Sequence, residues 1–165
     1  MITKAIFGEN RIIPHSKERA CARGIVVSDG KILLSYVPKS DFYMTPGGGL
    51  EKGETLFECC IREIAEETGY IVEPQAEPYF LLNEFYHEYK FVNNFFICRL
   101  SGMKTDVHLT ELEKEQNLIL KWLPLDKAFD IFSHYDDYCE TNEDKRGSYL
   151  RDYTALKCSE ELGFF

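Results

Sequence analysis

The chain of 165 residues lacks the features that define several large classes of protein. No apolar run approaches the roughly 18 residues of a membrane-spanning helix, so we expect no membrane partner. No Cys-x-x-Cys pair and no Cys–His spacing of a zinc site occurs. No low-complexity segment, repeat or linker interrupts the chain. With 44% hydrophobic residues, these absences predict one globular domain over residues 1–165.

Positive charge is also scarce. The chain has 19 Lys and Arg against 28 Asp and Glu, which gives a net charge of −9. A surface that binds nucleic acid through its phosphates needs a local excess of basic residues, so we expect no generic nucleic-acid binding. The argument does not extend to a single nucleotide, because bound metal ions reverse the sign of the local charge.

The six cysteines, at positions 21, 59, 60, 98, 139 and 158, indicate a reducing compartment. Cys59 and Cys60 are adjacent and cannot comfortably bond to each other. We interpret all six as reduced, several of them as small core residues. The first twelve residues, MITKAIFGENRI, carry charges and a glycine within their apolar part, unlike a signal peptide. These features predict a cytoplasmic location.

The most informative segment is residues 46–70, PGGGLEKGETLFECCIREIAEETGY. Its consecutive glycines lose too much backbone entropy for the interior of a helix or strand, so we expect a loop at 46–49. Thr55, followed three residues later by Glu58, forms a capping box, which predicts that a helix begins at Thr55. Gly69 can adopt the left-handed conformation and predicts where that helix ends.

Three carboxylates share one face of the expected helix. Glu63, Glu66 and Glu67 stand at i, i+3 and i+4, so their side chains lie within one turn. Like charges at this spacing repel by a few tenths of a kcal/mol per pair, roughly. A hard divalent cation removes this penalty, because Mg²⁺ prefers oxygen ligands. The alternative is an ordinary solvated acidic face, which the neighbouring glycines and Arg62 make the weaker interpretation.

These residues resemble the signature of the Nudix hydrolase family, which here spans residues 48–70. The matching positions, with Ile64 at the aliphatic place, are Gly48, Glu54, Arg62, Glu63, Glu66, Glu67 and Gly69. Tyr70 departs from the pattern, which usually has an aliphatic residue there. We expect it to pack at the start of a strand without loss of activity.

The resemblance implies hydrolysis of a phosphoanhydride bond in a nucleoside diphosphate linked to another group. Water would attack one phosphorus, with Mg²⁺ or Mn²⁺ as the cofactor that holds the phosphate oxygens. Glu63, Glu66 and Glu67 would be metal ligands, joined by the backbone carbonyl of Gly48.

The resemblance also implies supporting roles. Glu54 and Arg62 would form a salt bridge that fixes the glycine loop against the helix. A general base in the family often lies on a loop before a late strand, although some members use the box itself. The candidates here are Glu111, Glu113 and Glu115. We favour Glu115, because it stands nearest the following strand, although the segment also reads as a solvated polar loop.

The sequence leaves the substrate open. Arg23 lies in an expected strand and faces either the core or the substrate cleft. Tyr86 stands about sixteen residues beyond the box, where the resemblance associates Pro with ADP-ribose hydrolysis and Tyr with diadenosine polyphosphate hydrolysis. Tyr86, with Phe85 and Tyr89, either stacks on a base or belongs to the sheet. ADP-ribose, diadenosine polyphosphates, nucleotide sugars and (d)NTPs all remain candidates.

Two other functions are compatible with the same box. One is a non-catalytic Nudix-like domain that binds a nucleotide as a sensor. Three carboxylates on one face favour the enzyme, because a binding module has no need of them. The other is an RNA-end-processing enzyme of the same chemistry, which the acidic balance disfavours.

The remaining sequence predicts an α/β fold with a mixed sheet. Asp29-Gly30 is a strong hairpin turn signal, and an N-terminal hairpin is expected from Ile2–Phe7 and Arg11–Pro14. The other expected strands are residues 22–27, 31–37, 42–45, 70–73, 79–89, 91–100 and 118–123, and the later helices are 125–132 and 149–162. This order matches the α/β/α sandwich of the Nudix fold, with the mixed sheet between helices.

The chain ends in Gly-Phe-Phe, which places apolar aromatics at a terminus. These rings either dock on the domain, which we favour, or meet a second subunit in a homodimer. A small-molecule nucleotide is the principal partner that we expect.

Overall fold

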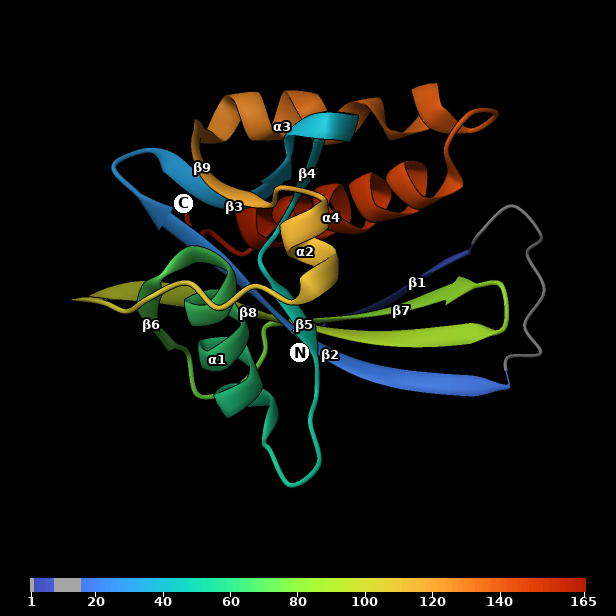
Figure 1. Ribbon diagram of the computed structural model, residues 1–165. Helices are drawn as coiled ribbons and strands as arrows, with labels where there is room; N and C mark the ends of the chain where they lie inside the picture. Colours follow the sequence, from blue (N-terminus) through green and yellow to red (C-terminus); the bar gives the residue numbers. More distant parts are fainter. Residues whose placement is uncertain (1, 8–15) are drawn as a thin grey trace.

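A computed structural model describes residues 2–7 and 16–165 of the protein. A mixed β-sheet lies between helix α1 (Leu56–Thr68) on one side and helices α3 (Leu125–Ser133) and α4 (Glu143–Glu161) on the other (Figure 1). The expected α/β/α arrangement is therefore confirmed.

Two long parallel strands form the centre of the sheet. These are β2 (Lys17–Ser28) and β8 (Tyr89–Lys104). On the outer side of β8, β7 (Phe80–Tyr86) runs antiparallel to it, and β1 (Ile2–Phe7) runs parallel to β7. The C-terminal half of β8 pairs instead with β6 (Tyr70–Pro74). The sheet divides in this way because β8 is long enough to have different partners along its length.

A second part of the sheet grows from the end of β2. Asp29 and Gly30, with φ of +50° and +71°, turn the chain into β3 (Lys31–Val37), as the hairpin signal predicted. Strands β4 (Phe42–Met44) and β9 (Ile119–Pro124) flank β3, both antiparallel to it.

The boundaries of α1 follow its sequence signals. Thr55 accepts a hydrogen bond from the Glu58 backbone N–H, and Glu58 in turn accepts from the Thr55 N–H, which completes the capping box. Gly69 ends the helix with φ of +73°. The prediction for this helix is confirmed.

Two other helical segments differ from expectation. Helix α4 begins at Glu143 rather than at Tyr149, because the Asn142 side chain accepts a hydrogen bond from the Lys145 N–H and caps an earlier start. The acidic segment expected as a loop contains a short helix, α2 (Glu111–Glu115), with its own capping box. Short 3₁₀ turns occur at Pro38–Ser40 and His134–Tyr138.

The glycine segment corrects one expectation. Residues 47–49 are not a loop but a short strand, β5 (Gly47–Gly49), antiparallel to β2. Gly47 has φ of +140°, and a Cβ there would overlap the carbonyl oxygen of Ala22. Glycine is therefore required by the close approach of two backbones, and this requirement outweighs its entropic cost in a strand.

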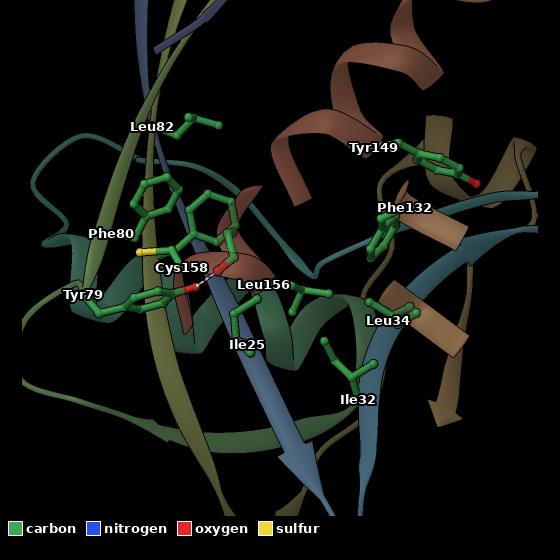
Figure 2. Close-up of a cluster of buried hydrophobic side chains, with 13 residues drawn as sticks. Ile25, Ile32, Leu34, Tyr79, Phe80, Leu82, Phe132, Tyr149, Leu156 and Cys158 are labelled. Carbon is green, nitrogen blue, oxygen red and sulfur yellow. Dashed lines mark hydrogen bonds between the residues drawn. The ribbon is translucent and has the colours of Figure 1, made fainter. Parts of the chain in front are cut away.

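Each side of the sheet has its own apolar core. Beneath α3 and α4 lies a cluster of buried aromatic and aliphatic side chains. Tyr79 belongs to it, and its hydroxyl donates a hydrogen bond of 2.9 Å to the carbonyl of Ala155 (Figure 2). Beneath α1, Cys60 and Ile64 pack against Phe96 and neighbouring side chains. The two cores hold the helices that contribute to the site on opposite sides of β2.

Two further expectations concern the ends of the chain. Arg11–Pro14, the proposed second strand of the N-terminal hairpin, lies outside the described residues. Phe164 packs edge-on against Tyr79, with ring centroids 5.4 Å apart, so this C-terminal ring contacts its own chain.

All six cysteines are free thiols. No helix among residues 2–7 and 16–165 is long and apolar enough to cross a membrane.

The core beneath α4 gives a test of the fold. Leu156→Ala removes a side chain with no exposed surface, and the cavity should lower the free energy of unfolding by about 2–5 kcal/mol. Urea denaturation followed by circular dichroism measures this change. Leu162→Ala, at a leucine that is 46% exposed just beyond α4, is the control. An equal loss in both variants would contradict the packing described.

Candidate active site

The site begins where β5 meets α1. A Cβ on Gly48 would overlap the carboxylate of Glu63, so the strand and the helix carboxylate are in close contact. Burial raises the pKa of Glu63, although the hydrogen bond from Arg62 opposes this shift. The absence of a side chain at Gly48 therefore allows an acidic group to reach the backbone of the strand.

Arg62 is the centre of the charged network. Its Nε and one terminal nitrogen donate to the two oxygens of Glu54, at 2.7 and 2.9 Å. Its other terminal nitrogen contacts Glu63 at 2.9 Å and Glu66 at 3.1 Å. Arg62 also donates to the carbonyl of Gly49 at 3.2 Å. The salt bridge predicted between Glu54 and Arg62 is present and ties α1 to both the preceding loop and β5.

Glu67 has a different environment from the other two carboxylates. It accepts a hydrogen bond of 2.5 Å from the hydroxyl of buried Ser35 on β3. Removal from water raises the pKa of Glu67 to about 8, even though Ser35 and the charge of Arg23 act in the opposite direction. Without a bound cation, this carboxyl group is therefore largely protonated at neutral pH.

The three carboxylates share the helix face but do not converge. Within the described part of the chain, no three Asp, Glu, His or Cys side chains are arranged to hold a metal ion. Arg62 binds Glu63 and Glu66, while Ser35 binds Glu67. The donors still suit Mg²⁺, because they are all oxygens on adjacent turns beside a strand that lacks side chains. Side-chain rotation is the change that a shared cation would require.

A cleft of about 390 Å³ lies beside β5. It is bounded by β2, β4, β5, β7, β8 and the first half of α4. Both substrate-binding candidates, Arg23 and Tyr86, line it. Tyr86 stands at the end of β7, with its ring against His87. The other lining residues are Arg19, Cys21, Phe42, Met44, Gly48, Gly49, Glu84, Phe91, Asn93, Glu143, Asp144, Gly147, Ser148 and Arg151.

Arg23 is held rigidly at the floor of this cleft. Its guanidinium donates to the side-chain oxygen of Asn93 at 3.2 Å and to the carbonyls of Thr45 and Gly47 at 3.0 and 3.3 Å. Burial, and then the charge of nearby Arg151, lower the pKa of Arg23. Two arginines that repel each other beside one cleft provide a favourable place for an anion.

Helix α4 contributes a part of the site that the sequence did not reveal. Buried Asp152 accepts hydrogen bonds from the N–H and hydroxyl of Thr45, at 2.9 and 3.0 Å. Arg151 pairs with the same carboxylate at 2.7 and 3.1 Å and lies 4.0 Å from Glu84. The Asn142 cap is the sequence signal from which the earlier start of α4 could have been predicted. No local motif indicates that Asp152 would bind Thr45.

The general-base candidates lie on α2. Glu111 is exposed and paired with Lys114, and Glu115 is exposed as well. Glu113 is half-buried and close enough for its charge to contribute to the raised pKa of Glu67. Of the three general-base candidates, it is therefore Glu113, and not the favoured Glu115, whose charge acts on Glu67.

Comparison with known families gives a match over most of the chain. The sequence profile described as NUDIX domain matches residues 18–140. This range includes β2, β5, α1 and α2, and it ends before α4.

Curated relatives match shorter stretches. The chain is 35% identical over 92 residues to an NAD-capped RNA hydrolase of Vibrio atlanticus, covering 50% of this chain and 34% of that protein. It is 47% identical over 51 residues to an ADP-ribose pyrophosphatase of Methanocaldococcus jannaschii, covering 29% and 30%. The chain thus matches only about a third of the length of these relatives.

Solved structures share the architecture. An ADP-ribose pyrophosphatase from Streptococcus suis has a TM-score of 0.56 at 19% identity, with 88% of this chain and 92% of that chain covered. A UDP-X diphosphatase has a TM-score of 0.58 at 20% identity, with coverage of 89% and 64%. Identities this low show the fold alone.

The raised pKa of Glu67 predicts how stability depends on pH in EDTA. Because the pKa of Glu67 in the folded protein, about 8, exceeds its usual 4.5, the folded state binds the extra proton. The free energy of unfolding should fall as pH rises between these values, by roughly 1–3 kcal/mol. Glu67→Gln should lack this component. Urea denaturation at pH 5.5 and 8.5 measures it, and identical pH dependence in both proteins would contradict the raised pKa.

Proposed function

Because the chain belongs to the Nudix family, we propose that it is a Mg²⁺- or Mn²⁺-dependent hydrolase of nucleoside diphosphates linked to another group. The observation that carries this proposal is the contact of β5 with α1 at one end of the cleft. The carboxylate of Glu63 contacts that strand at Gly48 from the helix side, and Arg19 and Arg23 contact it from the cleft side. A diphosphate in the cleft would therefore be adjacent to the acidic helix.

The carboxylates supply the proposed metal site. Glu63, Glu66 and Glu67, with the carbonyl of Gly48, would hold the cation. When bound, a divalent cation neutralises phosphate charge and lowers the pKa of a coordinated water, which supplies a nucleophile at neutral pH. Arg62 and Glu54 act as positioning residues, since their bidentate pair fixes the start of α1 against the loop.

The arginines supply binding and orientation. Arg23 is fixed by Asn93 and two backbone carbonyls, so little side-chain freedom is lost when it binds a phosphate oxygen. A preorganised cation near the reacting phosphoryl group also stabilises charge that develops in the transition state. Tyr86 at the rim is our candidate for contact with a base or sugar.

A base must remove the proton of the attacking water. We now place Glu113 ahead of Glu115 for this role, because Glu113 is half-buried and its charge reaches Glu67. Its carboxylate accepts a hydrogen bond from the Thr110 N–H at 2.7 Å, which fixes its position. A carboxylate held in this position can accept the proton as the phosphoanhydride bond breaks.

A nucleotide sensor without catalysis is the alternative. Such a domain would use the arginines and the cleft but would have no need of three carboxylates on one face of α1. The six free cysteines support our proposal of a reducing, cytoplasmic location. That residues 1–165 form one domain stays a prediction. So does the formation of a homodimer.

A substrate panel tests the hydrolase proposal. It contains ADP-ribose, NAD, diadenosine polyphosphates, nucleotide sugars and (d)NTPs at millimolar Mg²⁺, with products separated by chromatography. We expect turnover of one class and a decrease of at least about 100-fold in kcat for Glu67→Gln.

The matched control is Glu73→Gln, at an exposed acidic residue on β6. It should retain wild-type turnover. Tight nucleotide binding without turnover of any compound would reject the hydrolase in favour of the sensor.

The base assignment has its own test. Glu113→Gln should lower kcat and remove the acidic limb of its pH profile, whereas Glu115→Gln should leave both nearly unchanged. Glutamine can replace glutamate in a capping box, so α2 should remain folded. The opposite ranking of the two variants would restore Glu115 as the base.

A further inference from the structure

The cleft wall formed by α4 has a face that is not apolar. Asp144, Gly147, Ser148 and Arg151 stand at i, i+3, i+4 and i+7, so they occupy one side of the helix, and all four line the cleft. We call this set the α4 wall. It lies beyond the residues that match the family profile.

Gly147 allows α4 to pack closely against β7. Glycine inside a helix is unfavourable relative to alanine, and Gly147 is buried within α4. A Cβ at this position would lie 3.2 Å from a carboxylate oxygen of Glu84 on β7. The small residue therefore lets Glu84 approach the helix, and a larger side chain would crowd this carboxylate.

Charges of opposite sign line the cleft from β2 and from the start of α4. Beside β5, Arg19 has no ion-pair partner among the residues that the structure describes, and the side chain of Arg23 donates to neutral oxygens. At the start of α4, Asp144 is exposed and likewise has no ion pair with any described residue. Glu143, its neighbour, is bound to Arg146 at 2.7 Å. A ligand thus meets cationic side chains from β2 and the anionic side chain of Asp144 at the start of α4.

This polarity orients a nucleoside diphosphate. The diphosphate is attracted to Arg19 and Arg23, beside the acidic helix α1. The group that extends along the cleft then reaches Asp144 and the hydroxyl of Ser148, which accept hydrogen bonds from sugar hydroxyls or base amines. A further phosphate there would be repelled by Asp144.

On the basis of the proposed hydrolase function, we propose that the α4 wall selects substrates whose group beyond the diphosphate is unphosphorylated and rich in hydroxyl or amine donors. A cleft of about 390 Å³ has room for one such sugar or nucleoside. Compounds that carry a second anionic group on this part are disfavoured.

The test compares ADP-ribose with two derivatives that carry one extra phosphate. One has it on the adenosine 2′-hydroxyl and the other on the 1″ position of the distal ribose, so they report which half enters the cleft. We expect wild-type kcat/KM for at least one derivative to be about tenfold or more below that for ADP-ribose.

Asp144→Lys should shift that ratio towards the phosphorylated compound by about tenfold, and the shift should shrink at 0.5 M salt. Asp126→Lys is the matched control, since Asp126 also lies in the first turn of a helix, α3, away from the cleft. An unchanged ratio in Asp144→Lys would assign Asp144 to helix stability alone and would overturn the proposal.

Binding separates this inference from the hydrolase proposal. Calorimetry with the same three compounds and Glu67→Gln measures selection without turnover. Binding of ADP-ribose with the expected preference, but no hydrolysis by the wild type, would reject the enzyme and keep the selection. Hydrolysis of all three compounds at equal kcat/KM would reject the selection and support the enzyme. Absence of both binding and turnover of ADP-ribose would reject the selection proposed for the α4 wall, whereas the hydrolase proposal would then depend on the other compounds of the substrate panel.

Discussion

The bidentate pair between Arg62 and Glu54 is the interaction on which the rest of the site depends. It joins the first half of α1 to the loop before it, and the same guanidinium reaches Glu63, Glu66 and the carbonyl of Gly49. The hydrogen bonds that Arg62 donates to Glu54 raise the pKa of Arg62 further, so its guanidinium remains charged at any physiological pH. One cation thereby compensates several carboxylates that would otherwise repel one another.

Backbone proximity is the second constraint. Gly47 and Gly48 have neighbours, the Ala22 carbonyl and the Glu63 carboxylate, in the places that side chains would occupy. The strand can therefore separate acidic and basic groups by little more than the thickness of a backbone. This arrangement places opposite charges on the two sides of β5, which is what a site for a metal-bound phosphate requires.

Local patterns predicted much of this architecture, and non-local contacts account for what they missed. The capping box at Thr55, the stop at Gly69 and the Asp29-Gly30 turn are encoded by adjacent residues, and each is observed. The strand at 47–49 was wrongly expected as a loop, because its glycines are explained only by the partner β2. The sequence did not predict the α4 wall for the same reason. Its residues line a cleft only together with residues distant in sequence, such as Glu84 and Arg23.

The bond between Thr45 and Asp152 joins residues that are 107 positions apart in sequence. Contacts of such separation form slowly, because a long segment must be ordered before they are made. During synthesis the strands and α1 emerge well before α4, so a nascent chain lacks one wall of the cleft until its last helix has left the ribosome. Activity would therefore mature late, after most of the sheet has already folded.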